Sequence, residues 1–446
     1  MAFTDQAYDH DEVVEAVHGV YASFGFNPPP DQFTVLASFY LTRPAENSGV
    51  KSNEPRFKII SLSTGTKCTP AIKYSPRGEL LHDTHAEVLA RRGAVRWFIE
   101  EVGRMNSSFG YTSDWLAPTS GSNVSKDSDE NPPYRLKSNV SVHMYISTLP
   151  CGDASMGYLA STQDARMALL KSQSVHLFPK LQAHEASRGR DNYSRLGVLR
   201  TKPGRADSSP ALSMSCSDKI AKWSVLGILG GFASRFLEPV YVKSVVIGEF
   251  PLEVENTLRD IVSGDCERAL RTRVGNTERL PEGYAVHPPD IRFTDIPFVH
   301  SKSELDKIKQ TKGSCNESLC WVADSRPLEV LINGLKRSTP PKYRYTEKYR
   351  QGLFFEPLLS RISSFNLYND TLDLVGLTSV SCSPCSRESI SYAVAKKTSG
   401  RYQNAKSCLL GPGGPFSGWI RIDTQYQRFS VDGNHCTSLP ILSASI

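Results

Sequence analysis

The sequence lacks several features that would place it in special classes of protein. It has no apolar run approaching the ~18 residues of a membrane-spanning helix. Its first residues, Met1 to Gln6, carry no basic segment followed by an apolar stretch, so we expect no signal peptide. The ten cysteines are scattered without the spacing of a disulfide framework, which predicts reduced thiols in the cytoplasm and/or nucleus rather than a secreted protein.

The sequence also lacks internal repeats, and its composition is that of a soluble globular protein, with 39% hydrophobic and 22% charged residues over 446 positions. The net charge of +6 permits a polyanionic partner without requiring one. Strand patterns at 57–62, 140–147 and 241–247 alternate with helical patterns, which predicts an α/β fold with helices covering a sheet. We expect one domain over residues 1–446. A polar tract at about 106–137 is predicted to be a disordered surface insertion.

His85-Ala86-Glu87 is the motif around which we organise the functional analysis. It stands before an apolar-periodic stretch that predicts a helix. An imidazole and a carboxylate two residues apart can face one reaction centre, His85 as a metal ligand and Glu87 as the group that moves protons for a metal-bound water. By itself the pair is a weak signal in a chain with ten histidines.

Two cysteines occupy junctions like that of His85. Cys151 follows the predicted strand at 140–147, and Cys216 opens a long predicted helix that runs through about Phe236. A helix N-terminus favours a thiolate, because its free N–H groups stabilise negative charge. One histidine and two cysteines leave a fourth position for water, which is the pattern of a catalytic zinc site. Other close cysteine pairs, Cys315 with Cys320 and Cys382 with Cys385, have no second pair nearby and are interpreted as bystanders.

These motifs resemble a known family. His85-Ala86-Glu87 and Pro150-Cys151 are similar to the H-x-E…P-C signature of zinc nucleobase deaminases. The usual second cysteine is absent, since Ala154 occupies its position, and Cys216 within Ser-Cys-Ser-Asp-Lys replaces it. That combination resembles the RNA adenosine deaminase (editase) family. The resemblance implies a cytidine-deaminase-like three-layer sandwich enlarged by irregular insertions, with a Zn²⁺ site.

The family encloses inositol hexakisphosphate behind the active site, held by basic and aromatic side chains. The resemblance assigns this role to matching residues of the present chain: Arg91, Arg92, Lys219, Lys222, Trp223, Lys336, Tyr392, Lys396, Tyr402, Lys406 and Trp419. Apart from the family, cations on helices that pack inward require either water or an anion. Gly231 and Arg421 depart from the family pattern, so we expect an altered phosphate shell. The resemblance also implies a polar relay from Lys219 through Asp83 and Lys202 to Cys216, although a helix-capping Asp83 is an equal alternative.

The basic stretch 188–205 lies between two ligand-bearing segments and is the candidate RNA contact. We expect Arg200 and Arg205 to bind phosphates, and Thr66 resembles the residue that the family places near the target ribose. The segments 83–92 and 200–205 resemble the tRNA-specific branch, which converts the adenosine 3′ to the anticodon of alanine tRNA (position 37) to inosine. The motifs begin within the first ninety residues, so we expect no upstream double-stranded-RNA-binding module.

Three alternatives remain open from the sequence. A double-stranded-RNA adenosine deaminase would use the same chemistry. A free-nucleoside or cytidine deaminase needs far less chain. A non-catalytic RNA-binding protein on the same scaffold would require the loss of a ligand or of Glu87. We expect no membrane or DNA partner, and the sequence does not predict an oligomeric state.

Overall fold

The computed structural model describes residues 9–44, 57–107, 110–119, 131–161, 186–202, 204, 208–249, 256–275, 277, 279–325, 328–340, 356–377 and 390–436. In that part of the chain, no helix combines the length and the hydropathy required to span a bilayer.

The strands are β1 (Gln32–Phe33), β2 (Leu36–Thr42), β3 (Phe57–Thr64), β4 (Thr66–Cys68), β5 (Asp83–His85), β6 (Leu116–Pro118), β7 (Tyr134–Leu136), β8 (Ser141–Ile146), β9 (Ser187–Arg188), β10 (Arg200–Thr201), β11 (Val242–Ile247), β12 (Asp290–Phe293), β13 (Gly313–Ser314), β14 (Glu317–Val322), β15 (Glu329–Ile332) and β16 (Leu335–Lys336). The helices are α1 (His10–Ser23), α2 (Ala86–Ser107), α3 (Met156–Ser161), α5 (Cys216–Leu226), α6 (Gly230–Ala233), α7 (Asn256–Leu270), α8 (Lys302–Ile308), α10 (Arg361–Val375), α11 (Tyr392–Ala395) and α12 (Gly400–Leu410). Short 3-10 turns are η1 (Ala71–Lys73), η2 (Asp153–Ser155), η3 (Thr272–Val274) and η7 (Thr424–Gln427).

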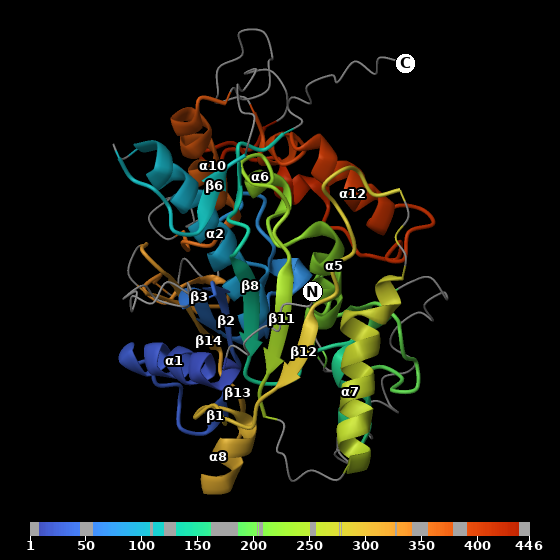
Figure 1. Cartoon of the computed structure of the whole chain (residues 1–446). Helices are drawn as coiled ribbons and strands as arrows, with labels where there is room; N and C mark the ends of the chain where they lie inside the picture. Colours follow the sequence, from blue (N-terminus) through green and yellow to red (C-terminus); the bar gives the residue numbers. More distant parts are fainter. Residues whose placement is uncertain are drawn as a thin grey trace.

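A mixed sheet of eight strands forms the centre of the molecule, in the order β12-β11-β8-β2-β3-β14-β15-β16 (Figure 1). The first three strands run parallel, and β2 pairs antiparallel with β8. The remaining strands continue antiparallel. This confirms the predicted α/β class with a sheet covered by helices.

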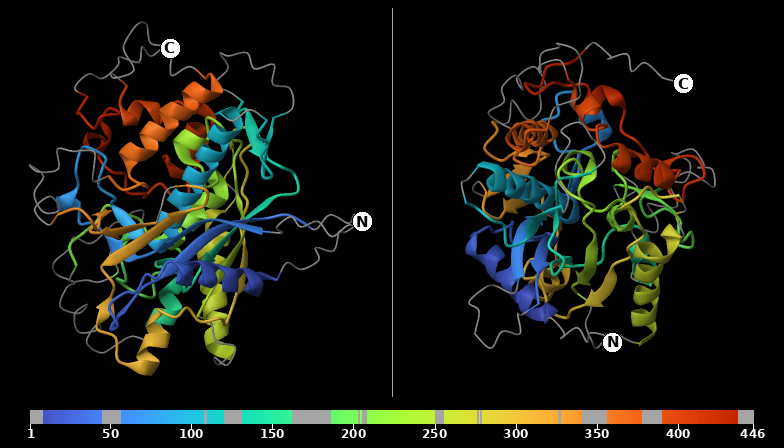
Figure 2. Two further views of the ribbon diagram at one scale, coloured as in Figure 1. Left: turned by 90° about the vertical axis from the view of Figure 1, so that its left-hand side faces the viewer. Right: turned by 45° about the horizontal axis from the view of Figure 1, so that its top comes forward.

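Helices cover both faces of this sheet, as the two views of Figure 2 show. Along β2, Leu36 and Tyr40 face α1, whereas Ala37, Phe39 and Leu41 face the larger core beneath α2, α5 and α10. A strand buried on both faces reads as a continuous apolar run, and every residue of β2 is buried. Helix α2 lies against β3 at Gly93, where a Cβ would stand 2.8 Å from the Ser61 Cβ.

Two predicted elements differ from the structure. The predicted helix 216–236 is two helices, because Gly227 adopts φ +62° after α5 and the chain restarts at α6. The predicted insertion 106–137 was wrong at its ends. Residues 116–118 and 134–136 pair as β6 and β7, and Trp115 and Leu116 are buried in the core. Residues 120–130 lie outside the described part of the chain.

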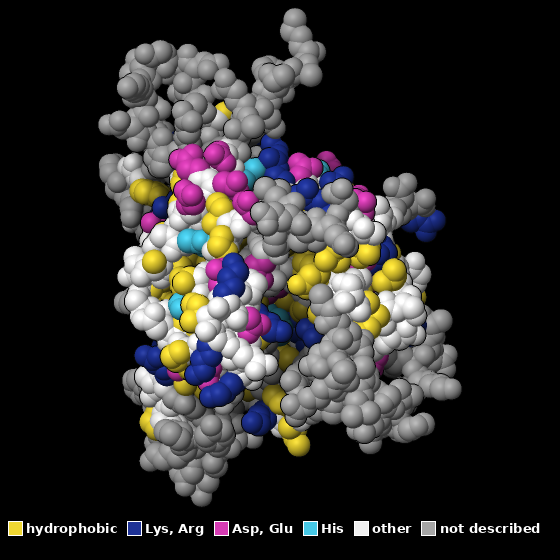
Figure 3. Space-filling view, turned by 90° about the horizontal axis from the view of Figure 1, so that it is seen from below, with side chains coloured by type: hydrophobic (Ala, Val, Ile, Leu, Met, Phe, Trp, Pro, Cys, Tyr) yellow, Lys and Arg dark blue, Asp and Glu magenta, His cyan; other side chains and the backbone are white. Residues whose placement is uncertain are grey.

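The parallel strands β8, β11 and β12 end at the lower side of the molecule in Figure 1. The loop after β8 leads directly to Cys151. Figure 3 views this side from below: Lys and Arg side chains (dark blue) and histidine (cyan) lie around a hollow near the middle of the face. Ligands in α/β sheets bind at the carboxyl ends of strands, so this is where a site is expected.

The interface between α1 and the sheet contains buried histidines. His18 Nε2 lies 2.8 Å from the Tyr145 hydroxyl, and His143 contacts Thr42 and Ser244 at 3.0 and 2.7 Å. Burial lowers the pKa of His18 to about 4. Burial, with repulsion from His10, Lys243 and Arg292, lowers the pKa of His143 to about 3. Both imidazoles are therefore neutral in the folded protein at pH 7.

This predicts a loss of stability in mild acid. The unfolded chain takes up protons at these positions below about pH 6.5, whereas the folded chain does not, so the free energy of unfolding decreases as pH falls towards 4. Each histidine contributes at most about 1.4 kcal/mol per pH unit. Urea denaturation between pH 7 and pH 5 should show a shallower pH dependence for His18→Gln and His143→Gln than for the wild type. An unchanged slope in both variants would contradict the prediction.

Candidate functional site

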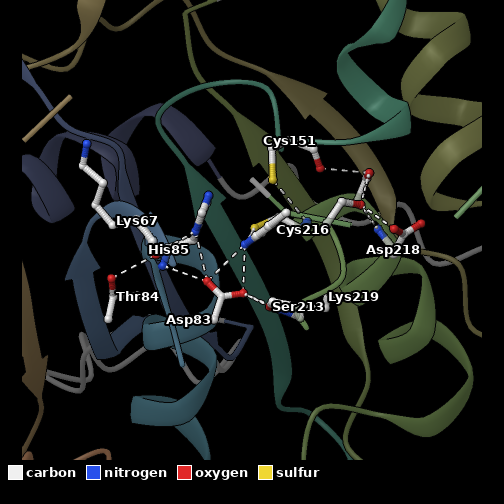
Figure 4. A network of polar contacts seen from close by, with 12 residues as sticks. Lys67, Asp83, Thr84, His85, Cys151, Ser213, Cys216, Asp218 and Lys219 are labelled. Carbon is white, nitrogen blue, oxygen red and sulfur yellow. Dashed lines mark hydrogen bonds and ion pairs between the residues drawn. The ribbon is translucent and has the colours of Figure 1, made fainter. Parts of the chain in front are cut away.

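His85 is held in one orientation by its own strand. It pairs with Thr66 across β4 and β5, and its Nδ1 lies 3.0 Å from Asp83 Oδ1 and 3.1 Å from the Lys67 carbonyl oxygen. With Nδ1 engaged, Nε2 points towards the two thiols (Figure 4). Burial lowers the pKa of His85, but the Asp83 and Cys151 contacts outweigh it and raise the pKa to about 9. The side chain is 16% exposed, so the site remains open to a substrate.

Cys151 and Cys216 are brought together by hydrogen bonds between their loops. The Cys216 backbone N–H contacts Cys151 Sγ at 3.4 Å, and the Ser217 N–H donates to the Cys151 carbonyl at 3.0 Å. Gly152 permits this approach: it adopts φ +108°, and a Cβ there would stand 2.2 Å from Ser215 Oγ. A hydrogen bond from Cys216 and the positive charge of Lys202 hold the pKa of Cys151 well below that of a free thiol.

Glu87 lies in the first turn of α2 and is 3% exposed. Its Oε2 has no hydrogen-bond partner among the described atoms. Burial, reinforced by the nearby Cys151, raises the pKa of this carboxyl. A carboxyl that is buried, unpaired and shifted in this direction is suited to take up and release a proton.

The convergence of one imidazole and two thiols was predicted, and a metal fits the donor set. Among the described residues, no group of three or more His, Cys, Asp or Glu side chains already stands at coordination spacing. Instead the Cys151 thiol is hydrogen-bonded to both His85 and Cys216. Metal ligation replaces such shared protons, since thiols bind as thiolates. Nitrogen and sulfur donors in this number suit Zn²⁺.

Asp83 is the hub of a buried polar network next to the thiols. Lys202 Nζ lies 3.0 Å from Asp83 Oδ2 and 3.0 Å from Cys216 Sγ, and Ser213 Oγ donates to Asp83 at 2.6 Å. Lys219 Nζ also donates to Asp83. Burial raises the pKa of Asp83, but Lys202, Lys219 and His85 together hold it well below its usual value. The four residues predicted for the relay are therefore in contact, and Asp83 is not a helix cap.

A second group of predicted residues forms a half-buried cluster of positive charge behind this network. The Lys222 ammonium has a pKa held well below its usual value by burial and by repulsion from Arg91, Lys406, Lys219 and Lys396. Lys406 has its pKa lowered by burial to about 8, and Arg91 to about 10. Lys222 stacks on Trp419 at 4.5 Å. Arg91 Nε is buried without a partner among the described atoms.

The tyrosines and Arg92 complete this cluster. Tyr392 and Tyr402 are buried, and Lys396 Nζ lies 5.3 Å from the Tyr392 ring. Despite its burial, the pKa of Tyr392 is lowered, because Lys396, Arg361 and Arg92 surround it. Arg92 donates to the Leu359 carbonyl at 3.1 Å. Among the described residues, no carboxylate forms an ion pair with Arg91, Lys222, Lys396 or Lys406.

The structure also corrects this set. Arg361, which was not predicted from the sequence, is the first residue of α10. Its positive charge lowers the pKa of Tyr392 and of Lys396, and it is repelled by Arg92. Its Nη2 contacts His82 Nδ1 at 3.3 Å. No local signal marked this arginine, because the segment 358–372 mixes apolar residues with Ser, Asn, Asp and Thr. Lys336 instead pairs with Glu329 at 3.0 Å. Trp223 packs edge-on against Phe39 in the main core.

Gly231 has a packing reason to lack a side chain. A Cβ at this position would stand 2.3 Å from the Lys396 carbonyl oxygen. Helix α6 therefore lies directly against the loop that carries Lys396. Arg421 places a further positive charge near Lys406 and donates to the Leu410 carbonyl at 3.0 Å.

The residues predicted to contact RNA differ in their exposure. The prediction for Arg200 was wrong, because the side chain is 0% exposed. Its guanidinium donates to carbonyls of Gly189, Asp191, Asn192 and Arg195 and so builds the 189–195 loop from within. Thr66 is half-buried beside His85. Arg205 lies outside the described part of the chain.

A sheet with this site at the carboxyl ends of its strands, and with a glutamate among histidine and cysteine donors, defines a deaminase. The chain matches the adenosine-deaminase (editase) domain family over residues 61–422 and belongs to that family, whose members are hydrolytic enzymes. This confirms the resemblance noted from the motifs.

Curated relatives fall into two groups. The tRNA-specific adenosine deaminase 1 of Schizosaccharomyces pombe is 32% identical over 314 residues, covering 70% of this chain and 72% of its own length. That of Saccharomyces cerevisiae is 31% identical over 289 residues, 63% of this chain and 64% of the relative. The mouse double-stranded RNA-specific adenosine deaminase is 27% identical over 407 residues, covering 89% of this chain but 30% of the relative.

The Asp83 network predicts a large effect of a single substitution. In Asp83→Ala, Lys202 and Lys219 keep their charges in a buried site without a counter-ion. We expect the free energy of unfolding to fall by about 3–5 kcal/mol, as for other buried pairs that lose one partner. Urea denaturation at pH 7 measures this loss. Glu304→Ala, which removes a partly exposed carboxylate paired with the exposed Lys307, is the control and should cost about 1 kcal/mol or less. Equal losses would contradict the assignment of Asp83 as the hub.

Proposed function

We propose that this chain converts adenosine to inosine in tRNA by hydrolytic deamination, at the adenosine 3′ to the anticodon (position 37) of alanine tRNA. The observation that carries the proposal is the buried Glu87 carboxyl, whose Oε2 has no hydrogen-bond partner among the described atoms, beside His85, Cys151 and Cys216. The Schizosaccharomyces pombe and Saccharomyces cerevisiae relatives are named tRNA-specific. The alignments with these two relatives cover 70% and 63% of this chain and 72% and 64% of the relatives, which supports a tRNA substrate.

His85, Cys151 and Cys216 would hold a Zn²⁺ ion. When bound, the ion supplies an activated water for attack at C6 of a splayed-out adenine. Glu87 would move the protons: its carboxyl takes one proton from the attacking water and gives it to the ring nitrogen, then passes the second proton of that water to the leaving amine, so that ammonia departs. Burial, with the nearby Cys151, raises the pKa of Glu87, which favours uptake of a proton by this carboxyl during the reaction.

The Asp83 network serves this chemistry by orienting donors. Asp83 fixes the His85 ring through Nδ1, which leaves Nε2 as the ligand atom. Lys202 donates to Cys216 Sγ at 3.0 Å and stabilises its thiolate. The same carboxylate therefore sets the orientation of one ligand and, through Lys202, the charge of another.

The buried cations would enclose inositol hexakisphosphate. Arg91, Arg92, Lys222, Lys396 and Lys406 point into one region without carboxylate partners among the described residues, and a compact polyanion neutralises such a set. Arg361, Tyr392, Tyr402 and Trp419 would complete the shell. Lys219 connects it to Asp83 and hence to the ligands.

The arrangement of helices on both faces of the sheet supports the finer assignment of a cytidine-deaminase-like three-layer sandwich. We also propose a single domain over residues 1–446 that works in the cytoplasm and/or nucleus. A double-stranded-RNA deaminase is the second candidate, because the mouse enzyme aligns with most of this chain. A non-catalytic RNA-binding protein is disfavoured, since Glu87 and all three donors are present.

Glu87→Gln tests the chemistry. The amide cannot carry a proton in this way, so we expect a fall in turnover of at least 10²-fold, the usual contribution of general acid–base catalysis. The assay measures inosine in alanine tRNA and, in parallel, in a long RNA duplex. Glu100→Gln is the matched control, because Glu100 lies on the same helix and pairs with Arg96.

Three outcomes separate the candidates. Inosine at the adenosine 3′ to the anticodon, lost in Glu87→Gln but kept in Glu100→Gln, supports the proposal. Inosine in the duplex alone favours the second candidate. An absence of inosine from both RNAs, in zinc-loaded protein, would contradict an enzymatic function.

The polyanion has its own test. Protein purified without added phosphates and then denatured should release about one inositol hexakisphosphate per chain, detected by mass spectrometry. Lys222→Met removes a buried cation, so we expect less ligand and a lower melting temperature. Lys336→Met is the control, because Lys336 pairs with Glu329 elsewhere, and should retain the full amount. Release of no polyphosphate from the wild-type protein would exclude the assignment.

A further inference from the structure

Two arginines from one segment hold the loops that carry the two thiols. The segment comprises α7 and η3, residues 256–274, and lies beside α5 (Figure 1). Arg268 contacts the loop after Cys151, and Arg273 contacts the start of the helix that Cys216 opens. The sequence analysis singled out neither residue. Arg268 pairs with Asp153, two positions after Cys151, and Arg273 pairs with Asp218, two positions after Cys216.

Arg268 holds the Cys151 loop through Asp153. Its Nε lies 3.0 Å from Asp153 Oδ2, and its Nη2 donates to the Asp153 carbonyl at 3.1 Å and to Asp265 at 2.7 Å. Asp153 is 0% exposed. Asp265 in turn accepts from the Gly157 backbone N–H. Two residues of α7 therefore hold the turn that follows Cys151: Arg268 at Asp153, and Asp265 at Gly157.

Arg273 holds the Cys216 helix through Asp218. Its Nη2 lies 2.6 Å from Asp218 Oδ1, and the two side chains are 5% and 0% exposed. The other carboxylate oxygen of Asp218 accepts from Ser215 Oγ at 2.6 Å and from the Arg200 N–H at 2.9 Å. Ser215 is the N-cap residue of α5, directly before Cys216. Phe416 covers the guanidinium at 5.2 Å.

One loop connects the two aspartates. The Gly197 N–H donates to Asp153 Oδ1 at 3.0 Å, and the Arg200 N–H donates to Asp218. Arg273 Nη1 donates to the Val198 carbonyl at 3.3 Å between them. Displacement of either arginine would therefore move a cysteine loop and this connection together.

We propose that Arg268 and Arg273 are positioning residues that fix the spacing and direction of the Cys151 and Cys216 thiolates. The inference rests on the proposed function, because it concerns the same metal donors. Neither arginine touches a donor atom; each acts through an aspartate and the backbone. Residues around a ligand commonly change metal affinity by 10–100-fold when they are replaced, because they set ligand orientation.

Arg271 supplies a matched control on the same segment. It pairs with Glu267 at 3.1 Å, its side chain is 32% exposed, and it donates to the Pro289 carbonyl away from the thiols. Arg271→Met removes a comparable side chain and charge. We expect it to leave the thiol site unchanged.

The experiment titrates Co²⁺ into metal-free full-length protein and records the thiolate-to-cobalt absorption. In Arg273→Met and Arg268→Met we expect a shifted or weakened band and a dissociation constant on the order of 10-fold higher. After loading with Zn²⁺, kcat on alanine tRNA should fall while KM stays near the wild-type value. Arg273→Lys and Arg268→Lys keep the charge and should recover part of the affinity, and they replace the methionine variants if those do not fold.

The outcomes distinguish this inference from the proposed function. A wild-type band that is unchanged in all four folded variants would overturn the positioning role, even if their melting temperatures fall. A band changed equally in Arg271→Met would also overturn it. An absence of any thiolate band in the wild-type protein would overturn the metal assignment itself, and the positioning role with it.

Discussion

The carboxylate of Asp83 is the interaction on which the site depends. It is buried among Lys202, Lys219 and Ser213, and it orients His85 through Nδ1. A buried carboxylate is unfavourable unless its partners are close and well directed, and here they are. Lys202 contacts both the Asp83 carboxylate and Cys216 Sγ, and Lys219 contacts the same carboxylate and lies near Lys222 in the cluster of cations. The proposed metal donors and the proposed phosphate shell are thus parts of one electrostatic network.

Positive charge is the second constraint. Arg91, Lys222, Lys396 and Lys406 lie half-buried near one another without carboxylate partners among the described residues, and burial, with repulsion from the other cations, lowers the pKa of Lys222. Such a core is stable only with a bound anion or with loss of protons. Binding of the proposed anion would therefore couple folding to the geometry behind the proposed site. Substitutions in this cluster would change stability and catalysis together.

Local motifs located the centre of the site because its donors lie at element boundaries. His85 ends β5 directly before α2, and Cys216 opens α5. Such junctions are visible as a strand pattern that changes to a helical one. The same reasoning failed for the predicted helix 216–236, because the apolar pattern did not reveal that Gly227 divides it into two helices. It also failed at 106–137, where a polar composition concealed the pairing of β6 with β7.

The sequence by itself predicted the α/β class, the proposed donors His85, Cys151 and Cys216, the position of Glu87 and most of the cations of the cluster. The tertiary structure alone decided which cations face inward and what they contact. Arg200 and Lys202 are two residues apart in one basic stretch, yet one builds a loop from within and the other contacts Asp83. Arg361, Arg268 and Arg273 carry no local signal of their role. The environment of a charge depends on distant segments packed around it, and residue spacing along the chain does not encode that packing.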